Sequence, residues 1–303
     1  MINTRSKNRI KEGSSAGTAI IYVLSALASI ITLYPMYYVL ILSLSAPQEA
    51  VKMEASLLPR GGVYLESYRI LLGDARLWRS YLNTILYVAG NTILMLATSV
   101  MAAYPLTYKK LYARRFVTFF LLVPMYFGGG LIPTFLLITK LGLYNTPCAM
   151  IIPTCFSIWN IILVKSYFNT IPESLREAAR IDGANNYQIL SRIFLPASKP
   201  ILAVISVYTI VGVWNSWFNA NVYLPTEEWQ PLQMYLRRVL VQQNINVTTD
   251  MGPEAAAAAA MQNLSNIQMR YAMIIFTTLP VLLVYPFLQK YFVQGVMLGS
   301  LKE

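Results

Sequence analysis

Long apolar segments dominate this chain of 303 residues and restrict it to a membrane. Hydrophobic residues make up 56% of the sequence and charged residues only 12%, which is more apolar surface than a soluble domain can bury. Segments of this length cross a bilayer of about 30 Å as helices. The sequence predicts one all-α domain with six membrane helices, at Thr18–Leu44, Tyr81–Tyr104, Phe116–Ile138, Pro147–Phe168, Pro200–Val222 and Tyr271–Val293.

Basic residues indicate how these helices are oriented. Lys and Arg collect in the cytoplasmic loops of membrane proteins, and here they precede the first helix and flank the connections between the second and third and between the fourth and fifth. We therefore expect both termini in the cytoplasm, with a tail at residues 1–17 and a transmembrane domain at 18–303. A cytoplasmic loop is expected at about 169–199 and a large outer loop at about 223–270. Scattered clusters of this kind do not indicate nucleic-acid binding.

The residue types that are missing exclude several functions. The chain has no His, no Asp or Glu within the six predicted helices, and no glycine-rich phosphate loop. Ion-coupled carriers usually place acidic groups at mid-membrane. We therefore expect no catalytic residue, no metal site and no cofactor in this chain, and any energy for transport must come from another subunit.

Two segments have unusual local composition. Gly128-Gly129-Gly130, followed by Pro133, interrupts the third predicted helix. This pattern indicates either a break that faces a water-filled path or a helix that ends at Phe127. In the outer loop, Pro253-Glu254 and the alanines at 255–260 predict a further helix.

A polar segment in the predicted cytoplasmic loop has the features of a docking helix. Pro172 can occupy its first turn, Gly183 predicts a left-handed end, and one face is kept flat by small residues. That face contains Leu175, Ala178, Ala179 and Asp182. The pattern alone also allows an amphipathic surface helix that simply joins two membrane helices.

The same segment resembles the EAA loop of type I ABC importer permeases. Glu177, Gly183 and Ile193-Phe194-Leu195-Pro196 match its pattern and spacing, while Ile189 stands where an aromatic residue is common. Further matches resemble the carbohydrate uptake family, in its polysaccharide and lipo-oligosaccharide branch, which is similar to the maltose-type second permease subunit. These matches include Tyr34-Pro35, Asn83-Thr84, Tyr104-Pro105-Leu106, Trp214-Asn215-Ser216-Trp217-Phe218, Pro231-Leu232-Gln233 and Tyr285-Pro286-Phe287-Leu288.

This resemblance implies a membrane permease subunit of an oligosaccharide importer in the bacterial plasma membrane. It implies a second homologous permease chain, two ATPase subunits that hold ATP and Mg, and an extracytoplasmic solute-binding lipoprotein. The ATPases would drive alternating access through a cytoplasmic coupling helix. The coupling positions that the resemblance assigns are Glu177, Ala178, Ala179, Asp182 and Gly183.

Aromatic and amide side chains mark a candidate substrate path, since sugars are held by aromatic faces and hydrogen-bonding groups. The candidates are Trp159, Asn160, Trp214, Asn215, Phe218 and Asn219. The same residues could instead form an interfacial belt or bond across helices. In the outer loop, Arg237 and Arg238 could favour an acidic oligosaccharide or contact the binding protein.

Three other functions remain open from sequence. A secondary, ion-coupled transporter would need the membrane-embedded acids that this chain lacks. An ABC permease for a non-sugar solute, such as amino acids or phosphate, is compatible with the EAA loop alone, although the flanking motifs favour a sugar. A membrane scaffold without transport activity leaves the docking segment unexplained.

Overall fold

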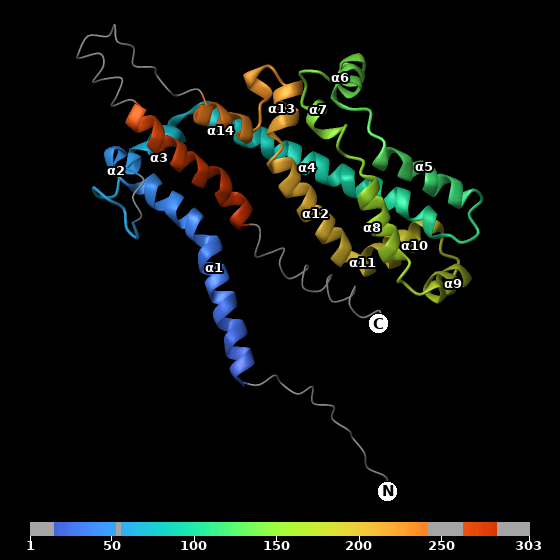
Figure 1. The fold of residues 1–303 in the computed structure, drawn as a ribbon. Coiled ribbons are helices and arrows are strands. Elements are labelled where there is room, and N and C mark those ends of the chain that lie inside the picture. The colour runs from blue at the N-terminus through green and yellow to red at the C-terminus, as the bar shows by residue number, and fades with distance from the viewer. Residues whose placement is uncertain (1–14, 53–55, 242–262, 284–303) are drawn as a thin grey trace. The chain divides into compact units, whose positions relative to one another are not determined.

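A computed structural model describes residues 15–52, 56–241 and 263–283. Every regular element in these ranges is a helix or a helical turn (Figure 1). The chain divides into two compact units, one of residues 1–68 with 245–275 and one of residues 69–244 with 276–303. Most of the expected N-terminal tail and the predicted helix at 255–260 lie outside the described residues.

The first unit contains α1 (Ser15–Leu44) and α2 (Pro47–Val51). The first part of a helix at Asn263–Leu283 belongs to the same unit. Its Gln268 is fully buried, donates from Nε2 to the Ser45 carbonyl at 2.7 Å and accepts from Ser67 Oγ at 3.0 Å. Burying an amide costs free energy unless its donors and acceptors are paired. Through these bonds Gln268 connects the helix at Asn263–Leu283 to the chain after α1 and to the start of α3 (Glu66–Gly73).

The second unit is built on α4 (Ala75–Ala103), which packs against α8 (Ile158–Phe168), α12 (Lys199–Trp214) and α14 (Leu232–Val241). The short α3 (Glu66–Gly73) precedes α4, and the Asp74 side chain caps α4 by accepting from the Arg76 amide at 2.9 Å. A 3₁₀ turn, η1 (Pro105–Thr107), follows α4. The apolar core of this unit lies where α4, η1, α8 and the start of α12 meet.

The structure has fewer continuous membrane helices than the six predicted. Among residues 15–52, 56–241 and 263–283, three helices are long and apolar enough to cross a bilayer, at Gly17–Leu44, Ala75–Thr107 and Asn263–Leu283. Two bent pairs of helices raise the possible number to five if each pair is one span. The chain is therefore a multi-pass membrane protein, but the remaining predicted spans are broken rather than straight.

The third predicted helix is broken at its glycines. It consists of α5 (Arg114–Tyr126) and α6 (Leu131–Lys140), which meet at an angle of 111°. Gly130 has φ 83° and ψ −179°, a conformation that is essentially restricted to glycine. α5 ends at Tyr126, just before Phe127, as one interpretation expected. That the break lies along a water-filled path, as the other interpretation expected, stays a prediction.

The fourth predicted helix is also interrupted, between α7 (Cys148–Ile151) and α8. Side chains of α4 bond to the irregular backbone there. Asn91 Nδ2 donates to the Ile151 carbonyl at 3.0 Å, and Thr98 Oγ1 donates to the Cys155 carbonyl at 2.7 Å. Non-helical backbone within a membrane must be satisfied by protein groups in this way.

The fifth predicted helix ends early, because α12 stops at Trp214 and a separate helix, α13 (Trp217–Tyr223), follows. A 3₁₀ turn, η3 (Glu227–Trp229), leads to α14. Polar residues of α4 again bond to this region, since Asn83 Nδ2 donates to the Glu228 carbonyl at 2.8 Å and Tyr87 Oη to the Trp229 carbonyl at 2.7 Å. One stripe of α4 thus bonds both to the break between α7 and α8 and to η3.

Candidate functional site

The segment between α8 and α12 folds around one short amphipathic helix, α9 (Glu173–Ile181), with Pro172 at its N-cap. It ends as expected, since Gly183 has φ 79°. The Gly183 amide donates to the Arg180 carbonyl at 3.0 Å and the Ala184 amide to the Ala179 carbonyl at 2.9 Å. This pair of bonds is the Schellman motif, which fixes the direction in which the chain leaves α9.

The chain then returns to the membrane through three short turns. They are α10 (Asn186–Ile189), the π-helical turn η2 (Leu190–Phe194) and α11 (Leu195–Ala197). Asn185 and Gln188 form a capping box at the start of α10. The helical stretch at Asn186–Ala197 meets α12 at 77°, so this segment, which we term the connecting segment (residues 172–198), turns sharply before α12.

Arg176 attaches α9 to the end of α4. Its side chain is only 2% exposed, and Nη2 donates to Thr107 Oγ1 at 2.9 Å. The guanidinium carbon lies 4.2 Å from the ring centre of Tyr108 and 4.8 Å from that of Phe194, which are cation–π distances. Glu173 Oε1 lies 3.4 Å from Nη1, so the buried charge has a partner on the exposed side.

Aromatic rings beneath Arg176 join the connecting segment to the membrane helices. The rings of Tyr104 at the C-cap of α4, Phe168 of α8 and Phe194 of η2 contact one another edge to face, with ring centres 5.2–6.4 Å apart. Ile189, the departure from the usual aromatic, is fully buried in the same cluster. Packed rings therefore link α9, through Arg176, to the end of α4, to α8 and to η2.

The outward face of α9 carries the residues expected to couple with a partner. Glu177, Ala178, Asp182 and Gly183 are exposed, whereas Ala179 is half-buried against the core. The sequence placed Ala179 on the same face as Ala178, and the structure separates them by packing Ala179 inward. α9 also exposes the apolar side chains of Leu175 and Ile181, of which Ile181 is 87% exposed, and the following α10 exposes Tyr187.

Two hollows border this face. One, of about 830 Å³, lies between α9 and the end of α4 and is lined by Tyr104, Tyr108, Glu173, Glu177, Arg180 and Tyr187, among others. The other, of about 360 Å³, includes Ala179, Asp182, Gly183 and Arg192. Residues of α9 therefore contribute to the walls of both hollows.

The predicted path residues do not share one environment. Trp159 is exposed and Asn160 buried, both in α8. Trp214 is 6% exposed, and its Nε1 donates to the Thr277 carbonyl at 3.1 Å while its ring contacts Tyr81 at 5.7 Å. Its surroundings are those of a packing residue, so its expected place in the path remains a prediction.

The other path residues lie at the break between α12 and α13, where helical spacing no longer applies. Asn215 Oδ1 accepts from Gln233 Nε2 of α14 at 3.1 Å. Phe218 is 48% exposed and contacts Trp217 edge to face. Asn219 is half-buried in α13. The sequence spacing of Trp214, Phe218 and Asn221 would suit one face of a continuous helix, but these residues lie on two helices, because α12 ends at Trp214 and α13 begins at Trp217.

Amides and aromatic rings gather where α13 meets α14. Asn221 Oδ1 accepts from Arg237 Nη1 at 2.7 Å, and the Arg237 guanidinium lies over the Trp217 ring at 4.6 Å. Gln233 and Arg237 are four residues apart, so they share one face of α14. We term the group the α13 cluster, formed by Asn215, Trp217, Phe218, Asn221, Gln233 and Arg237.

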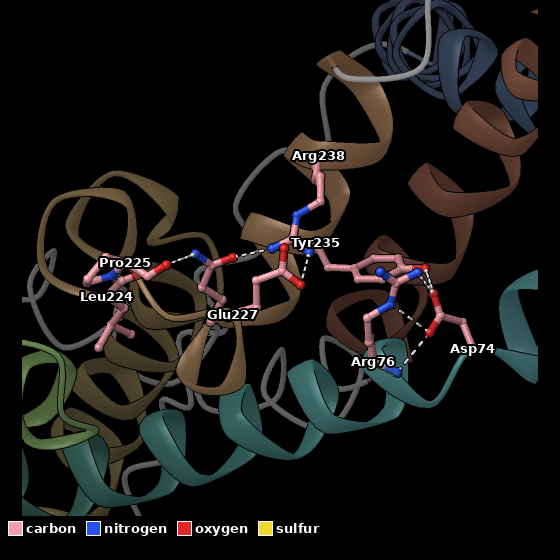
Figure 2. A network of polar contacts seen from close by, with 8 residues as sticks. Asp74, Arg76, Leu224, Pro225, Glu227, Tyr235 and Arg238 are labelled. Carbon is pink, nitrogen blue, oxygen red and sulfur yellow. Dashed lines mark hydrogen bonds and ion pairs between the residues drawn. The ribbon is translucent and has the colours of Figure 1, made fainter.

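A second polar network holds α14 to the start of α4 (Figure 2). Tyr235 Oη donates to Asp74 Oδ2 at 2.8 Å, and Asp74 also pairs with Arg76 at 3.2 Å. Further along α14, Arg238 pairs with Glu227 at 2.8 Å and donates to Gln230 Oε1, while Gln230 Nε2 donates to the Leu224 carbonyl at 3.0 Å. These contacts hold the loop that joins α13 to α14, the two helices that carry most of the α13 cluster.

The charge of Asp74 is favoured within this network. Partial burial alone raises the pKa of its carboxyl, but hydrogen bonds from Arg76 and Tyr235 outweigh that effect, and the pKa lies below its usual value. The phenol of Tyr235 has a raised pKa, first because it is buried and then because it donates to a carboxylate. Asp74 is therefore ionised and Tyr235 neutral at physiological pH.

Arg176 and the polar stripe of α4 were not recognised from sequence as functional positions. Arg176 lies within the connection whose basic residues indicate the orientation, and Asn83 lies within one of the matching motifs. The signal for Arg176 was its place between Leu175 and Glu177, on the side of α9 that also holds Ala179. Its aromatic partners are 68 to 72 residues earlier or 18 later in the chain, beyond the reach of helical periodicity.

Comparison with known families gives one clear match. Residues 95–298 match the family described as binding-protein-dependent transport system inner membrane component. That range contains the connecting segment and the α13 cluster.

Individual relatives match over almost the whole chain. A polygalacturonan/rhamnogalacturonan transport system permease protein of Bacillus subtilis is 33% identical and covers 93% of this chain and 97% of its own. The protein LplC of the same organism is 32% identical, over 90% of each chain. A diacetylchitobiose uptake system permease protein of Streptomyces coelicolor is 27% identical over 94% of this chain and 89% of its own.

The fold is similar to that of solved structures. A chain from a bacterial ABC transporter involved in the import of the acidic polysaccharide alginate superposes with a TM-score of 0.81 at 34% identity, and the match covers 96% of this chain and 99% of that one. A chain from a second alginate transporter structure shares the fold at 16% identity and a TM-score of 0.53.

Proposed function

This chain belongs to the family of binding-protein-dependent transport system inner membrane components, and from that premise we propose that the solute it imports is an oligosaccharide. The chain is a membrane permease subunit and not an enzyme, since the family and the named relatives are transport components. Its transport depends on a solute-binding protein, as the family description states.

The names of the relatives support an oligosaccharide substrate. They include permeases for polygalacturonan/rhamnogalacturonan, diacetylchitobiose, melibiose/raffinose/stachyose and arabinooligosaccharides. The α13 cluster supports the same substrate from geometry, since half-exposed rings beside amide groups suit a sugar, with its apolar faces and hydroxyls. Trp159, Asn160, Trp214 and Asn219 remain further candidates for the path.

The connecting segment carries the proposal for energy coupling. In this proposal α9 inserts into an ATPase subunit, with Glu177, Ala178, Asp182 and Gly183 at the contact and Ala179 packing behind them. Arg176 and the ring cluster beneath it then carry the movement into α4, α8 and η2, which opens the permease alternately to each side. ATP and Mg are held by two ATPase subunits, and this chain pairs with a second, homologous permease.

Orientation follows from the same assignment. We place the chain in the bacterial plasma membrane with both termini and α9 in the cytoplasm, in agreement with the distribution of Lys and Arg. The α13 cluster then faces the outside, because α12 begins next to the connecting segment and ends at the cluster (Figure 1). Its 16 residues span about 24 Å, which is most of the bilayer core.

Cysteine cross-linking in the assembled transporter tests this arrangement. The two native cysteines, Cys148 and Cys155, are first replaced by alanine. Ala178→Cys on the outward face of α9 should cross-link to an ATPase subunit in membranes, with higher yield in the presence of ATP if the contact tightens on closure.

The matched control is Lys140→Cys, which is also exposed but lies at the end of α6 on the proposed outer side. It should give no ATPase adduct and should react with a membrane-impermeant maleimide added to intact cells. An ATPase adduct from position 140, together with none from position 178, would reverse the proposed orientation. Failure of the reconstituted complex to take up any oligosaccharide with ATP and binding protein would reject the oligosaccharide substrate.

A further inference from the structure

Arg237 differs from three arginines in the same region because no described carboxylate neutralises it. Arg76 pairs with Asp74, Arg79 with Glu228 and Arg238 with Glu227. For Arg237, the contacts among the described residues are the Asn221 side chain and the Trp217 ring. Both are uncharged, so its positive charge is available to a ligand.

The surroundings of Arg237 hold its guanidinium in place. The ring of Trp217, itself 41% exposed, supports the flat face of the guanidinium at 4.6 Å, and the bond to Asn221 fixes Nη1 at 2.7 Å. Arginine has five N–H donors in a planar fork, and the described contacts use one of them. A fork that is oriented in advance loses less entropy when it binds a carboxylate through two parallel bonds.

The groups beside Arg237 have the chemistry of a sugar site. Phe218 offers an apolar surface, and the bonded pair of Asn215 and Gln233 lies on the adjoining part of α13 and α14. Amides of this kind bond to hydroxyl groups. A carboxylate-bearing sugar ring matches all three features, whereas a neutral sugar would leave the charge of Arg237 without a partner.

We propose that the α13 cluster is a subsite for an acidic oligosaccharide and that Arg237 binds a uronate carboxylate there. This inference rests on the proposed import of an oligosaccharide and adds its charge class. Arg237 is a specificity residue in this proposal, and Trp217 is a positioning residue that orients it. An acidic side chain of the binding protein could also supply the carboxylate, and the experiment below distinguishes this source from a sugar.

The test uses the complete transporter in proteoliposomes with its binding protein. Uptake is measured for tetragalacturonate and tetramannuronate and for their carboxyl-reduced, neutral forms. Arg237→Gln should raise the half-saturating concentration of the acidic forms about tenfold, as expected for the loss of a charged hydrogen bond, and leave that of the neutral forms unchanged. Arg237→Lys should give an intermediate value, because Lys keeps the charge but lacks the fork.

The matched control is Arg79→Gln, which removes the same charge from an arginine that already has a carboxylate partner. It should leave the ratio between acidic and neutral uptake unchanged. Trp217→Leu keeps Arg237 but removes the ring over which its guanidinium lies. It should lower the ratio of acidic to neutral uptake, as Arg237→Gln does.

Three results would overturn the inference. Equal effects of Arg237→Gln on acidic and neutral forms, or none on either, would remove the carboxylate contact. The second result concerns the ligand-free binding protein. If Arg237→Gln needs a higher concentration of it than the wild type does to stimulate the ATPase, the carboxylate that contacts Arg237 belongs to the binding protein. A wild-type complex that imports only the neutral forms would reject the acidic class but keep oligosaccharide import, whereas one that imports no oligosaccharide at all would reject the proposed function itself.

Discussion

At the scale of single residues, Gly183 shows how one backbone angle sets the position of a functional surface. Its φ of 79° lies in a region that other L-residues enter at a cost of about 1–2 kcal/mol. The two Schellman bonds that depend on this angle direct the chain from α9 into α10. This feature was predictable from sequence, because a glycine after a short polar helix is a frequent helix end.

Gly183→Val should therefore misplace α9 without preventing membrane insertion. No atom lies within 4 Å of an added Cβ at this position, so the cost comes from backbone strain and not from a clash. We expect weaker association with the ATPase subunits and lower transport at equal protein level. The control is Gly73→Ala, which has no positive φ and equal space. Normal transport by Gly183→Val would show that the turn is not needed for coupling.

Asp74 gives a residue-scale prediction for pH. Its pKa is lowered in the folded protein, so it stabilises the fold above the pKa of an unfolded Asp, near 3.9, and this stabilisation is lost as the pH falls through the lower, folded pKa. Asp74→Asn keeps a good helix cap but removes the charge. At pH 7 it should lower the free energy of unfolding by about 1 kcal/mol or less, since exposed ion pairs contribute little.

The difference in melting temperature between wild type and Asp74→Asn should shrink as the pH is lowered below 4. Asp182→Asn serves as the control, because Asp182 is an exposed Asp with no side-chain hydrogen bond or ion pair among the described contacts. A difference that stays constant from pH 7 to pH 3 would mean that the charge of Asp74 does not stabilise the attachment of α14.

At the scale of elements, the sequence predicted where apolar segments occur better than where helices break. The break at Gly128–Gly130 was visible because glycine and proline are poor helix formers. The break after Trp214 contains neither, and it forms where Asn215 bonds to Gln233 of α14. Such a contact depends on a residue that is 18 positions away, so local periodicity could not reveal it.

The break between α5 and α6 permits a paired test of two neighbouring glycines. Gly130 has a glycine-only conformation, whereas Gly128 has no positive φ and nothing within 4 Å of an added Cβ. Gly130→Ala should destabilise the bend by about 1–3 kcal/mol and Gly128→Ala should have little effect. Thermal unfolding in lipid nanodiscs measures both, and equal melting temperatures for the two variants would contradict a conformational requirement at Gly130.

At the scale of the whole molecule, composition was sufficient to predict a multi-pass helical membrane protein, and the EAA-like spacing was sufficient to predict the family. The number of continuous spans was not predictable, because contacts from distant residues accompany the breaks. Asn91 and Thr98 of α4 bond to the irregular backbone between α7 and α8, and Asn215 at the end of α12 bonds to Gln233 of α14. The anchor at Arg176 was missed for the same reason, since its partners come from distant parts of the chain.

The same whole-molecule reading predicts the energy source. The six predicted spans contain no Asp or Glu and the chain has no His or phosphate loop, so it offers no membrane-embedded acid to couple a proton gradient and no site of its own for nucleotide hydrolysis. The purified chain alone should show no ATPase activity.

Uptake by the full complex in proteoliposomes, with ATP held constant inside the compartment that contains the ATPases, should be unchanged by a proton uncoupler. If uptake instead stops when the proton gradient is removed at fixed ATP, the protein is an ion-coupled carrier. Arg176 and the ring cluster beneath it would then not serve to couple the chain to an ATPase.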